Sequence, residues 1–432
     1  MKFLLVLLLL IPVITSSDDH KPEESHEGAE DEKNAQALNE VVKRNNEFAF
    51  NFFKQLTSVS SQGKDSPPKN LVMSTFSISS ALSMLLLGAQ SKTHQEILEG
   101  LSLNNTNLPE SEVHRAYSTL LHLLNEPKRS LQVDNALFVE QTLTLGKNFE
   151  DDLRNLYHAE IRKTKFNDPQ EAKKEVNEFV MIEPEVEIKE PVKEISSDTM
   201  LSNHVLFEGE WQDAFNPAFT STRKFKADKN TEVDVPMMHR KGQYNTYHDT
   251  ELPCTVVELP YKNDVSMIIA MAEPGKIHEV EQGLSAETVQ RWKTSWSKTL
   301  IDLYLPKFNI TSKINLVDEL PEVGIRTPFT GAANFSGITP DFRLKVGSAV
   351  HQAVINVDEK GTVATAATAA TAATAATAAT AAAAAAAAAA VGNVEMSLPP
   401  LRFYNHPIVV IFINQITDNI LFMGTVTNPT EK

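Results

Sequence analysis

The sequence predicts a single α+β domain, because segments with helical periodicity and segments with strand periodicity follow one another in blocks. Apolar residues recur at three- and four-residue steps near the N-terminus, whereas short apolar runs typical of buried strands dominate beyond residue 200. A doubly wound parallel sheet would alternate the two patterns regularly along the chain. The chain has 432 residues, 42% hydrophobic and 22% charged, so one large core is possible.

Three helices are predicted at the start of the domain. The first has one largely apolar face, formed by Leu38, Val41, Val42, Asn45, Phe48, Phe52 and Leu56. A loop rich in Gly, Ser and Pro at residues 58–69 ends this helix. A second, buried helix at 78–86 closes at Gly88, and a third runs over 93–98.

The rest of the chain is predominantly strand-like. Between residues 131 and 174 the pattern changes from strand-like around Phe138 to helical around Leu153, and another helix is predicted near 285–295. Further strands are predicted at 203–207, 254–260, 265–272, 300–305, 351–357 and 407–413.

The N-terminal end indicates secretion. Residues 1–17 have the features of a signal peptide, since Lys2 precedes an apolar run at 3–13 that is too short to span a bilayer of about 30 Å. Residues 18–34 carry eight acidic side chains against two lysines, so we expect a disordered tail ahead of a domain at 35–432. Sequons at Asn104, Asn309 and Asn334 would permit N-glycosylation.

Charge, cysteine content and motifs exclude several function classes. A net charge of −16 without a basic stripe argues against a nucleic-acid partner. A single cysteine, Cys254, excludes an intramolecular disulfide framework and a cysteine-based zinc site. The motifs GxSxG, HExxH, GxxxxGK[ST], GxGxxG and the EF-hand loop do not occur. We therefore predict no catalytic residues, no metal and no cofactor.

An unrelated secreted hydrolase is the remaining enzymatic alternative, because catalytic triads are spatial and need no local motif. Cys254 would be its sharpest nucleophile candidate. The surrounding run LPCTVVEL is strand-like, however, and would bury the thiol as a small hydrophobic side chain.

Several stretches resemble motifs of the serpin family and follow in the family's order. Residues 70–100 resemble its early strand and helix, with Thr75 where the family has proline, and NHVLFEGEWQDAF at 203–215 resembles the signature NxxxFKGxWxxxF. Further matches are VPMM at 235–238, VSMIIAMAEPGK at 265–276, NFSGIT at 334–339, VHQAVINVDEKGT at 350–362, and the C-terminal NHPIVVIFI and LFMGTVTNP. The likeness to secreted antitrypsin-like serpins covers nearly all of 35–432.

This resemblance implies an α+β fold with three β-sheets, about nine helices and an exposed reactive loop, here at 359–400. In the family mechanism a protease cleaves the loop, becomes acylated, and is carried away and distorted when the loop inserts into the central sheet. The resemblance further implies a monomer whose partner is an extracellular serine protease, with no membrane contact.

The hinge of the predicted loop satisfies one requirement of this mechanism. Inserted side chains face a packed interior at alternate positions, so they must be small. The hinge residues are Glu359, Gly361, Thr362, Val363, Ala364, Thr365, Ala366 and Ala367. The low-complexity segment at 363–390 that follows contains only Ala and Thr after Val363.

The bait bond is a point of departure from the family. EMSLPP at 395–400 resembles the antitrypsin pattern and places the scissile bond at Met396–Ser397, which suits an elastase- or chymotrypsin-like pocket. Family spacing of roughly sixteen residues after Glu359 would instead place it near Ala375. Residue 396 lies 21 positions beyond 375, which adds roughly 70 Å of extended tether.

Two functions remain open at this point. One is inhibition of an elastase- or chymotrypsin-like serine protease through Met396–Ser397. The alternative is a non-inhibitory serpin, either a carrier or a protease substrate, because the loop is about 21 residues too long. The unusual segment at 181–203 would also impair insertion, and the absence of a basic helix near 92–100 argues against heparin activation.

Overall fold

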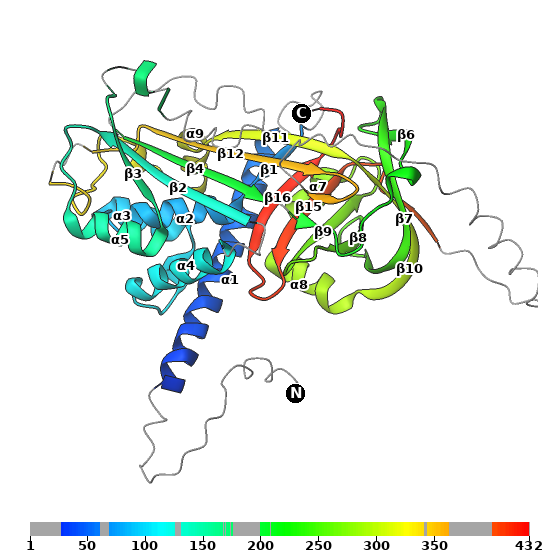
Figure 1. Cartoon of the computed structure of the whole chain (residues 1–432), viewed down its shortest axis with the longest axis horizontal. Coiled ribbons are helices and arrows are strands. Elements are labelled where there is room, and N and C mark those ends of the chain that lie inside the picture. Colours follow the sequence, from blue (N-terminus) through cyan, green and yellow to red (C-terminus); the bar gives the residue numbers. More distant parts are fainter. Residues whose placement is uncertain are drawn as a thin grey trace, which may run out of the picture.

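Hydrogen-bonded β-sheets form the framework of the molecule, shown as a computed structural model in Figure 1. The structure describes residues 27–60, 69–125, 131–166, 168, 170–172, 174–175, 199–207, 209–340, 344–362 and 400–431. The prediction of an α+β domain is confirmed. In Figure 1, helices α2 to α5 gather beneath one end of the central sheet. A second group of strands, which includes β6 to β10, forms the opposite end of the molecule.

The central sheet, called sheet A here, contains seven strands within the described residues. Its order is β3-β2-β4-β12-β13-β5, with β11 paired to β12 on the other side. The strands are β2 (Leu131–Glu140), β3 (Glu160–Thr164), β4 (Thr199–Phe207), β5 (Gly209–Glu210), β11 (Phe308–Asn315), β12 (Ser348–Val357) and β13 (Gly361–Thr362).

The remaining described strands have the order β1-β16-β15-β9-β8-β7-β10-β14, with β6 paired to β7. They are β1 (Leu71–Met73), β6 (Ser221–Lys226), β7 (Glu232–Asp249), β8 (Cys254–Pro260), β9 (Val265–Ala272), β10 (Ser297–Pro306), β14 (Leu401–Phe403), β15 (Ile408–Asn414) and β16 (Ile420–Val426). The 18-residue strand β7 pairs with β8 at its C-terminal end and with β6 at its N-terminal end. It therefore joins sheet B (β1, β16, β15, β9, β8) to sheet C (β6, β10, β14), which gives the three expected sheets.

The predicted strands match the observed ones well where apolar runs are continuous. Strands β8 and β9 cover the predicted ranges 254–260 and 265–272. The other predicted strands fall within β4, β10 and β12 or within one residue of β15. Strands β8, β9 and β15 are buried along most of their length, so their apolar runs have few alternative placements, whereas β10 and β12 alternate buried and more exposed positions.

Helices pack against the sheets (Figure 1). They are α1 (Glu27–Ser60), α2 (Thr75–Leu86), α3 (Ser91–Gly100), α4 (Glu110–Leu124), α5 (Lys147–Tyr157), α7 (Ile277–Gly283), α8 (Ala286–Ser295) and α9 (Leu316–Glu319). All twelve residues of α2 are buried, including its five serine and threonine residues. The side chain of Ser74 caps this helix by accepting a hydrogen bond from the backbone N–H of Ser77.

The expected boundary between a disordered tail and an ordered domain at residue 35 is wrong. Helix α1 begins at Glu27, eight residues earlier, and continues to Ser60, beyond the predicted stop. The added turns contain good helix formers, and the ammonium of Lys33 lies 2.5 Å from a carboxylate oxygen of Glu112 on α4. Composition alone predicted disorder for this segment, whereas the structure has it as part of α1, in contact with α4 through this ion pair.

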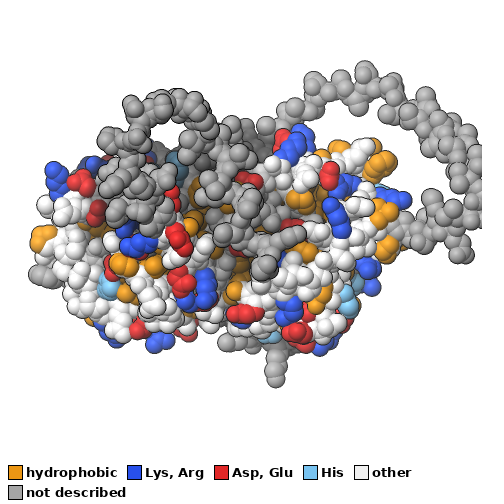
Figure 2. Space-filling model, turned by 90° about the horizontal axis from the view of Figure 1, so that it is seen from below, with side chains coloured by type: hydrophobic (Ala, Val, Ile, Leu, Met, Phe, Trp, Pro, Cys, Tyr) orange, Lys and Arg blue, Asp and Glu red, His pale blue; other side chains and the backbone are white. Residues whose placement is uncertain are grey.

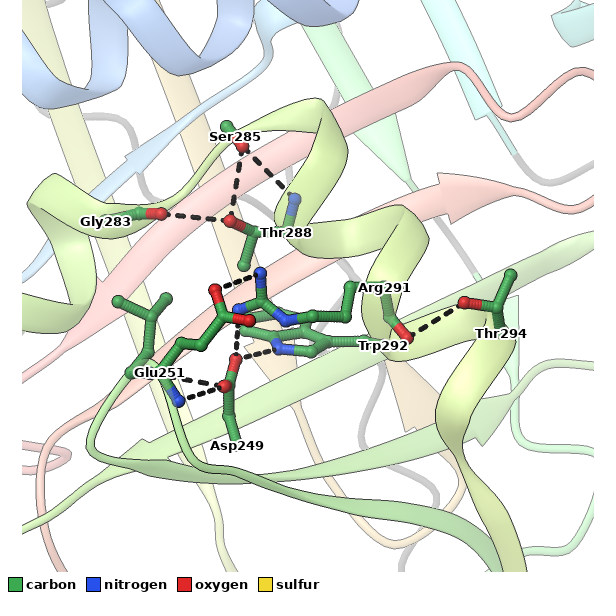
Figure 3. Close-up of polar contacts among 9 residues, drawn as sticks. Asp249, Glu251, Gly283, Ser285, Thr288, Arg291, Trp292 and Thr294 are labelled. Carbon is green, nitrogen blue, oxygen red and sulfur yellow. Dashed lines mark hydrogen bonds and ion pairs between the residues drawn. The ribbon is translucent and has the colours of Figure 1, made fainter.

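A buried polar cluster fixes helix α8 to strand β7 (Figure 3). Oδ2 of Asp249 accepts hydrogen bonds from Trp292 Nε1 at 2.6 Å and from Arg291 Nη2 at 2.7 Å. Its Oδ1 accepts one from the backbone N–H of Glu251 at 2.8 Å. Burial alone would raise the pKa of Asp249, but these hydrogen bonds lower it below its ordinary value. Both oxygens are thus engaged by the protein, which assigns Asp249 a structural role.

Candidate functional site at the loop hinge

The predicted hinge forms a tight hairpin at one end of sheet A. Strand β12 ends at Val357, the chain turns, and β13 returns so that Thr362 pairs with Val357. Asp358 closes the turn, since its backbone N–H donates to Gly361 O at 2.8 Å and its Oδ1 accepts from the backbone N–H of Lys360 at 2.8 Å. Gly361 and Thr362, the third and fourth residues of the predicted loop at 359–400, are therefore already part of the sheet.

Strand β13 occupies the position at which a longer inserted strand would begin. It is antiparallel to β12 and also antiparallel to β5, where Gly361 pairs with Glu210 and Thr362 with Gly209. Farther along the sheet, β4 and β12 pair directly in parallel, from Met200↔Ser348 to Val205↔Ala353. At one end of sheet A, β13 therefore lies between β12 and β5. Farther along the sheet, β4 and β12 pair directly, with no strand between them.

Gly361 is required by the close approach of two backbones. A Cβ atom at this position would lie 1.8 Å from the carbonyl oxygen of Gly209 and 2.8 Å from the Cα of Glu210. Neither contact can be relieved by a side-chain rotation, because both atoms belong to the backbone. Only glycine therefore allows β13 to pair with β5.

An aromatic cluster holds the end of the hinge. Thr362 is 1% exposed, and its hydroxyl lies 2.6 Å from the hydroxyl of Tyr261. The ring of Tyr261 stacks on Trp211 at 4.3 Å between centroids and contacts the edge of Phe207 at 5.1 Å. Burial raises the pKa of Tyr261 well above its ordinary value, so the phenol stays neutral.

Trp211 fixes the turn by two hydrogen bonds. Its backbone N–H donates to Lys360 O at 2.8 Å, and its indole Nε1–H donates to Asp358 O at 2.9 Å. The ring is 1% exposed. Any movement of the hinge must therefore break contacts to this tryptophan.

Glu359 is held by a cation and a hydroxyl. Its Oε2 lies 2.6 Å from Lys307 Nζ, and its Oε1 accepts a hydrogen bond from Thr220 Oγ1 at 2.7 Å. Burial alone would raise the pKa of Glu359, but these contacts lower it below its ordinary value. Lys307 directly precedes β11, so the ion pair fastens the hinge to the neighbouring strand.

The other predicted site residues are distributed as follows. Asn104 and Asn309 are exposed, whereas Asn334 is half-buried and its Oδ1 accepts from the backbone N–H of Ser336 at 3.2 Å.

Cys254 is 1% exposed, and burial raises the pKa of its thiol to about 12, which argues against the hydrolase alternative. Five calls lie wholly or largely outside the described residues: the signal peptide, the hinge residues Val363 to Ala367, the low-complexity segment, residues 181–198 of the unusual segment at 181–203, and the bait bond Met396–Ser397.

Sequence reasoning missed Lys307, Thr220 and Tyr261 as hinge partners. These residues lie 52, 139 and 101 positions from their partners in the chain. Glu359 and Thr362 could be named from a family pattern, but the sequence contained no signal for the side chains that meet them.

Within the described ranges, no group of three or more His, Cys, Asp or Glu side chains is arranged to hold a metal ion. No described helix is long and apolar enough to cross a membrane.

Comparison with known proteins supports the sequence resemblance. The family model "Serpin (serine protease inhibitor)" matches residues 43–429. The chain is 38% identical over 399 residues to serine protease inhibitor A6 of Xenopus laevis, covering 90% of this chain and 84% of that protein. It is 34% identical over 409 residues to alpha-1-antiproteinase F of Cavia porcellus, covering 94% and 95%. The structure of human thyroxine-binding globulin is similar, with a TM-score of 0.79, 31% identity and coverage of 91% and 100%.

Proposed function

Because the chain belongs to the serpin family, we propose that it is a secreted protein that inhibits an extracellular serine protease through the bait bond Met396–Ser397. The protease would be elastase-like or chymotrypsin-like, since a methionine side chain suits their main pockets. Residues 1–17 would serve as the signal peptide, and the exposed Asn104 and Asn309 are the better glycosylation candidates.

The hinge hairpin is the observation that carries this proposal. An inserted strand must be antiparallel to β12, and β13 already has that orientation at Val357↔Thr362. If this register continued, each further loop residue would face the preceding residue of β12. Thr371 would then lie opposite Ser348, where β12 begins.

The residues of this extended strand fit the sheet interior. Thr362 points into the aromatic cluster, so the positions that alternate with it would also face the core. These are Ala364, Ala366, Thr368 and Ala370. Small side chains at all four positions would avoid the overpacking cost of about 1–3 kcal/mol for each enlarged residue.

Insertion would also replace one set of backbone pairs, between β4 and β12, by two sets, one on each edge of the inserted strand. The direct β4–β12 pairs are parallel, and an inserted strand would separate them and form antiparallel pairs on both of its edges. Each added backbone hydrogen bond contributes about 0.5–1.5 kcal/mol net, so completion of the strand favours the cleaved, inserted form.

Loop length favours the second candidate, a non-inhibitory serpin that is cleaved as a substrate or acts as a carrier. Met396 lies 25 positions beyond Thr371, the end of the extended strand. Extended, this segment would span roughly 80 Å at about 3.3 Å per residue, so a bound protease would not be pressed against the body. The likeness to human thyroxine-binding globulin also points to a carrier.

The test is incubation of the mature protein with elastase and with chymotrypsin, followed by denaturing gels and sequencing of the released peptide. A band that survives denaturation at the summed mass, together with a peptide that begins at Ser397, is the expected result. Cleavage at Ser397 without that band would assign the substrate or carrier function instead.

A further inference from the structure

Four rings form a continuous row across the outer face of sheet C. Tyr304 of β10 stacks between His239 of β7 and Phe403 of β14, with centroid distances of 4.2 Å on both sides. Phe219, in the turn before β6, meets the edge of His239 at 6.2 Å. We call Phe219, His239, Tyr304 and Phe403 the ring row.

Cationic and apolar groups extend this surface. The guanidinium of Arg223 lies 4.8 Å from the Tyr304 centroid and 5.6 Å from that of Phe403. Phe219 and Leu401 are 59% and 55% exposed, although large apolar side chains are usually buried. Figure 2 shows orange and blue side chains together at the end of the molecule that carries β6, β7 and β10 in Figure 1.

The rings of this surface differ in how much they contribute to the hydrophobic core. Tyr304 packs on a small buried cluster of Phe225, Val235 and Met237, so its ring has a structural role. Phe219 is not part of that cluster and presents more than half of its surface to solvent. Aromatic and arginine side chains are the groups most enriched at protein–protein interfaces, where they contribute most of the binding energy.

The chain connects this surface to the bait bond by a short segment. The carbonyl oxygen of Pro400 accepts a hydrogen bond from the backbone N–H of Asp302 at 3.1 Å, which fixes the chain on β10. Ser397 precedes Pro400 by three residues, a reach of at most about 10 Å. A protease is wider than that, since about 30 Å is the diameter of even a small domain. An enzyme seated at Met396–Ser397 therefore overhangs β14 and the rings beside it.

We propose that the ring row, with Arg223 and Leu401, is a docking surface for the serine protease that engages the loop. This inference rests on the proposed function and adds a second contact to the bait. The partner presents apolar and acidic groups to the rings and to Arg223. The surface acts on the encounter with the intact loop, because cleavage transfers the acylated enzyme to the long tether on the N-terminal side.

The test compares Phe219→Ala and Arg223→Glu with matched controls elsewhere on the surface. Ile416→Ala removes an apolar side chain that is 61% exposed in the turn between β15 and β16. Arg154→Glu reverses a cation that is 60% exposed on α5. The measured quantity is kcat/KM for cleavage of the full chain by chymotrypsin and elastase, with a synthetic peptide of residues 390–402 as the reference substrate. Thermal unfolding of each variant checks that the fold is kept.

We expect Phe219→Ala and Arg223→Glu each to lower kcat/KM for the full chain at least five-fold, while both controls match the wild type. Wild-type rates for all four variants, with the cut still at Ser397, would overturn the docking surface and leave the proposed function intact. A cut elsewhere in the loop would disprove the bait assignment, and the ratio between variants would still decide the docking proposal.

Docking is also measured without cleavage. Chymotrypsin and elastase blocked at the catalytic serine cannot react with the bait, yet at least one should bind the wild-type chain saturably. The Kd of that complex should rise at least five-fold with Arg223→Glu and not with Arg154→Glu. Absence of saturable binding by both blocked enzymes would overturn the proposal, whatever the active enzymes do to the loop.

Discussion

The ammonium of Lys307 lies 2.6 Å from Oε2 of Glu359, at the point where β12 ends and the loop begins. The Glu359 side chain is 11% exposed and that of Lys307 is 33% exposed, so the pair is largely shielded from solvent. Water screens such a pair less than a surface pair, and its loss leaves two partly buried charges without partners.

Glu359→Lys should therefore loosen the hinge. We expect a loss of about 1.5–3 kcal/mol in the free energy of unfolding, the usual cost of hydrogen bonds to charged groups. Amide hydrogen exchange at 358–362 should become faster. Glu210→Lys is the matched control, because the Glu210–Lys262 pair nearby has side chains 66% and 63% exposed and should contribute nothing measurable. Equal effects of the two reversals would contradict a special role for Glu359.

Gly361→Ala should prevent β13 from pairing with β5, and so should prevent insertion of the loop from starting there. The new Cβ would meet the carbonyl oxygen of Gly209, so β13 must separate from β5, at a cost of about 1–3 kcal/mol. The fluorescence of Trp211, which is bonded to Asp358 and Lys360, should change. Gly331→Ala is the control, since a Cβ there would meet nothing within 4 Å. Unchanged trapping of a protease by Gly361→Ala would show that insertion of the loop does not start from this hairpin.

Deletion of Ala370 to Ala390 should raise the fraction of protease molecules that are trapped. The change removes 21 residues and leaves the hinge residues and the bait bond in place. The tether shortens by roughly 70 Å, so insertion would again press the enzyme against the body. Densitometry of trapped against cleaved bands measures the ratio. A ratio that stays flat would exclude tether length as the defect and make the segment at 181–203 the next target.

Met396→Arg should redirect the reaction to trypsin-like enzymes. The bait side chain fills the main pocket of the protease, and an acidic pocket accepts arginine where an apolar one does not. We expect cleavage between residues 396 and 397 by trypsin at a rate at least ten-fold above that of the wild type, and slower cleavage by chymotrypsin. N-terminal sequencing of the released peptide locates the cleaved bond. An unchanged preference for chymotrypsin over trypsin would contradict the assignment of Met396 as the bait residue.

Stability should fall as the pH rises from about 4.3 to 7, because of Glu281. Burial raises the pKa of this carboxyl to about 7, although the Thr425 hydroxyl at 2.7 Å lowers it in part. The ordinary pKa is about 4.3, so the native state binds the proton more tightly than the unfolded state. The stabilisation is fully present below pH 4.3 and is lost as the pH passes 7, up to about 4 kcal/mol in total.

Glu281→Gln removes this titration and should stabilise the protein at pH 8 more than at pH 5. His278 Nδ1 lies 3.7 Å from Oε2 of Glu281. Urea unfolding at the two pH values measures the difference. Glu279→Gln on the same helix alters a carboxylate that is 55% exposed and paired with Lys276, so its two curves should keep the wild-type spacing.

The strands at 254–260 and 265–272 could be predicted because their requirement is local: continuous apolar runs must be buried. The small side chains of the predicted hinge are read directly from the sequence, and their insertion into the sheet stays a prediction. The start of α1 could not be predicted in the same way. Its first turns are polar, and the ion pair between Lys33 and Glu112 depends on how α1 packs against α4.

The sequence by itself determined the fold class, the family and the composition of the hinge. Only the tertiary structure decided that Thr362 meets Tyr261, that Glu359 meets Lys307, and that Gly361 lies against the backbone of Gly209. It also decided that four rings from separate parts of the chain form one row beside Pro400. Such contacts join residues many positions apart, and they depend on strand register and sheet order, which local periodicity does not encode.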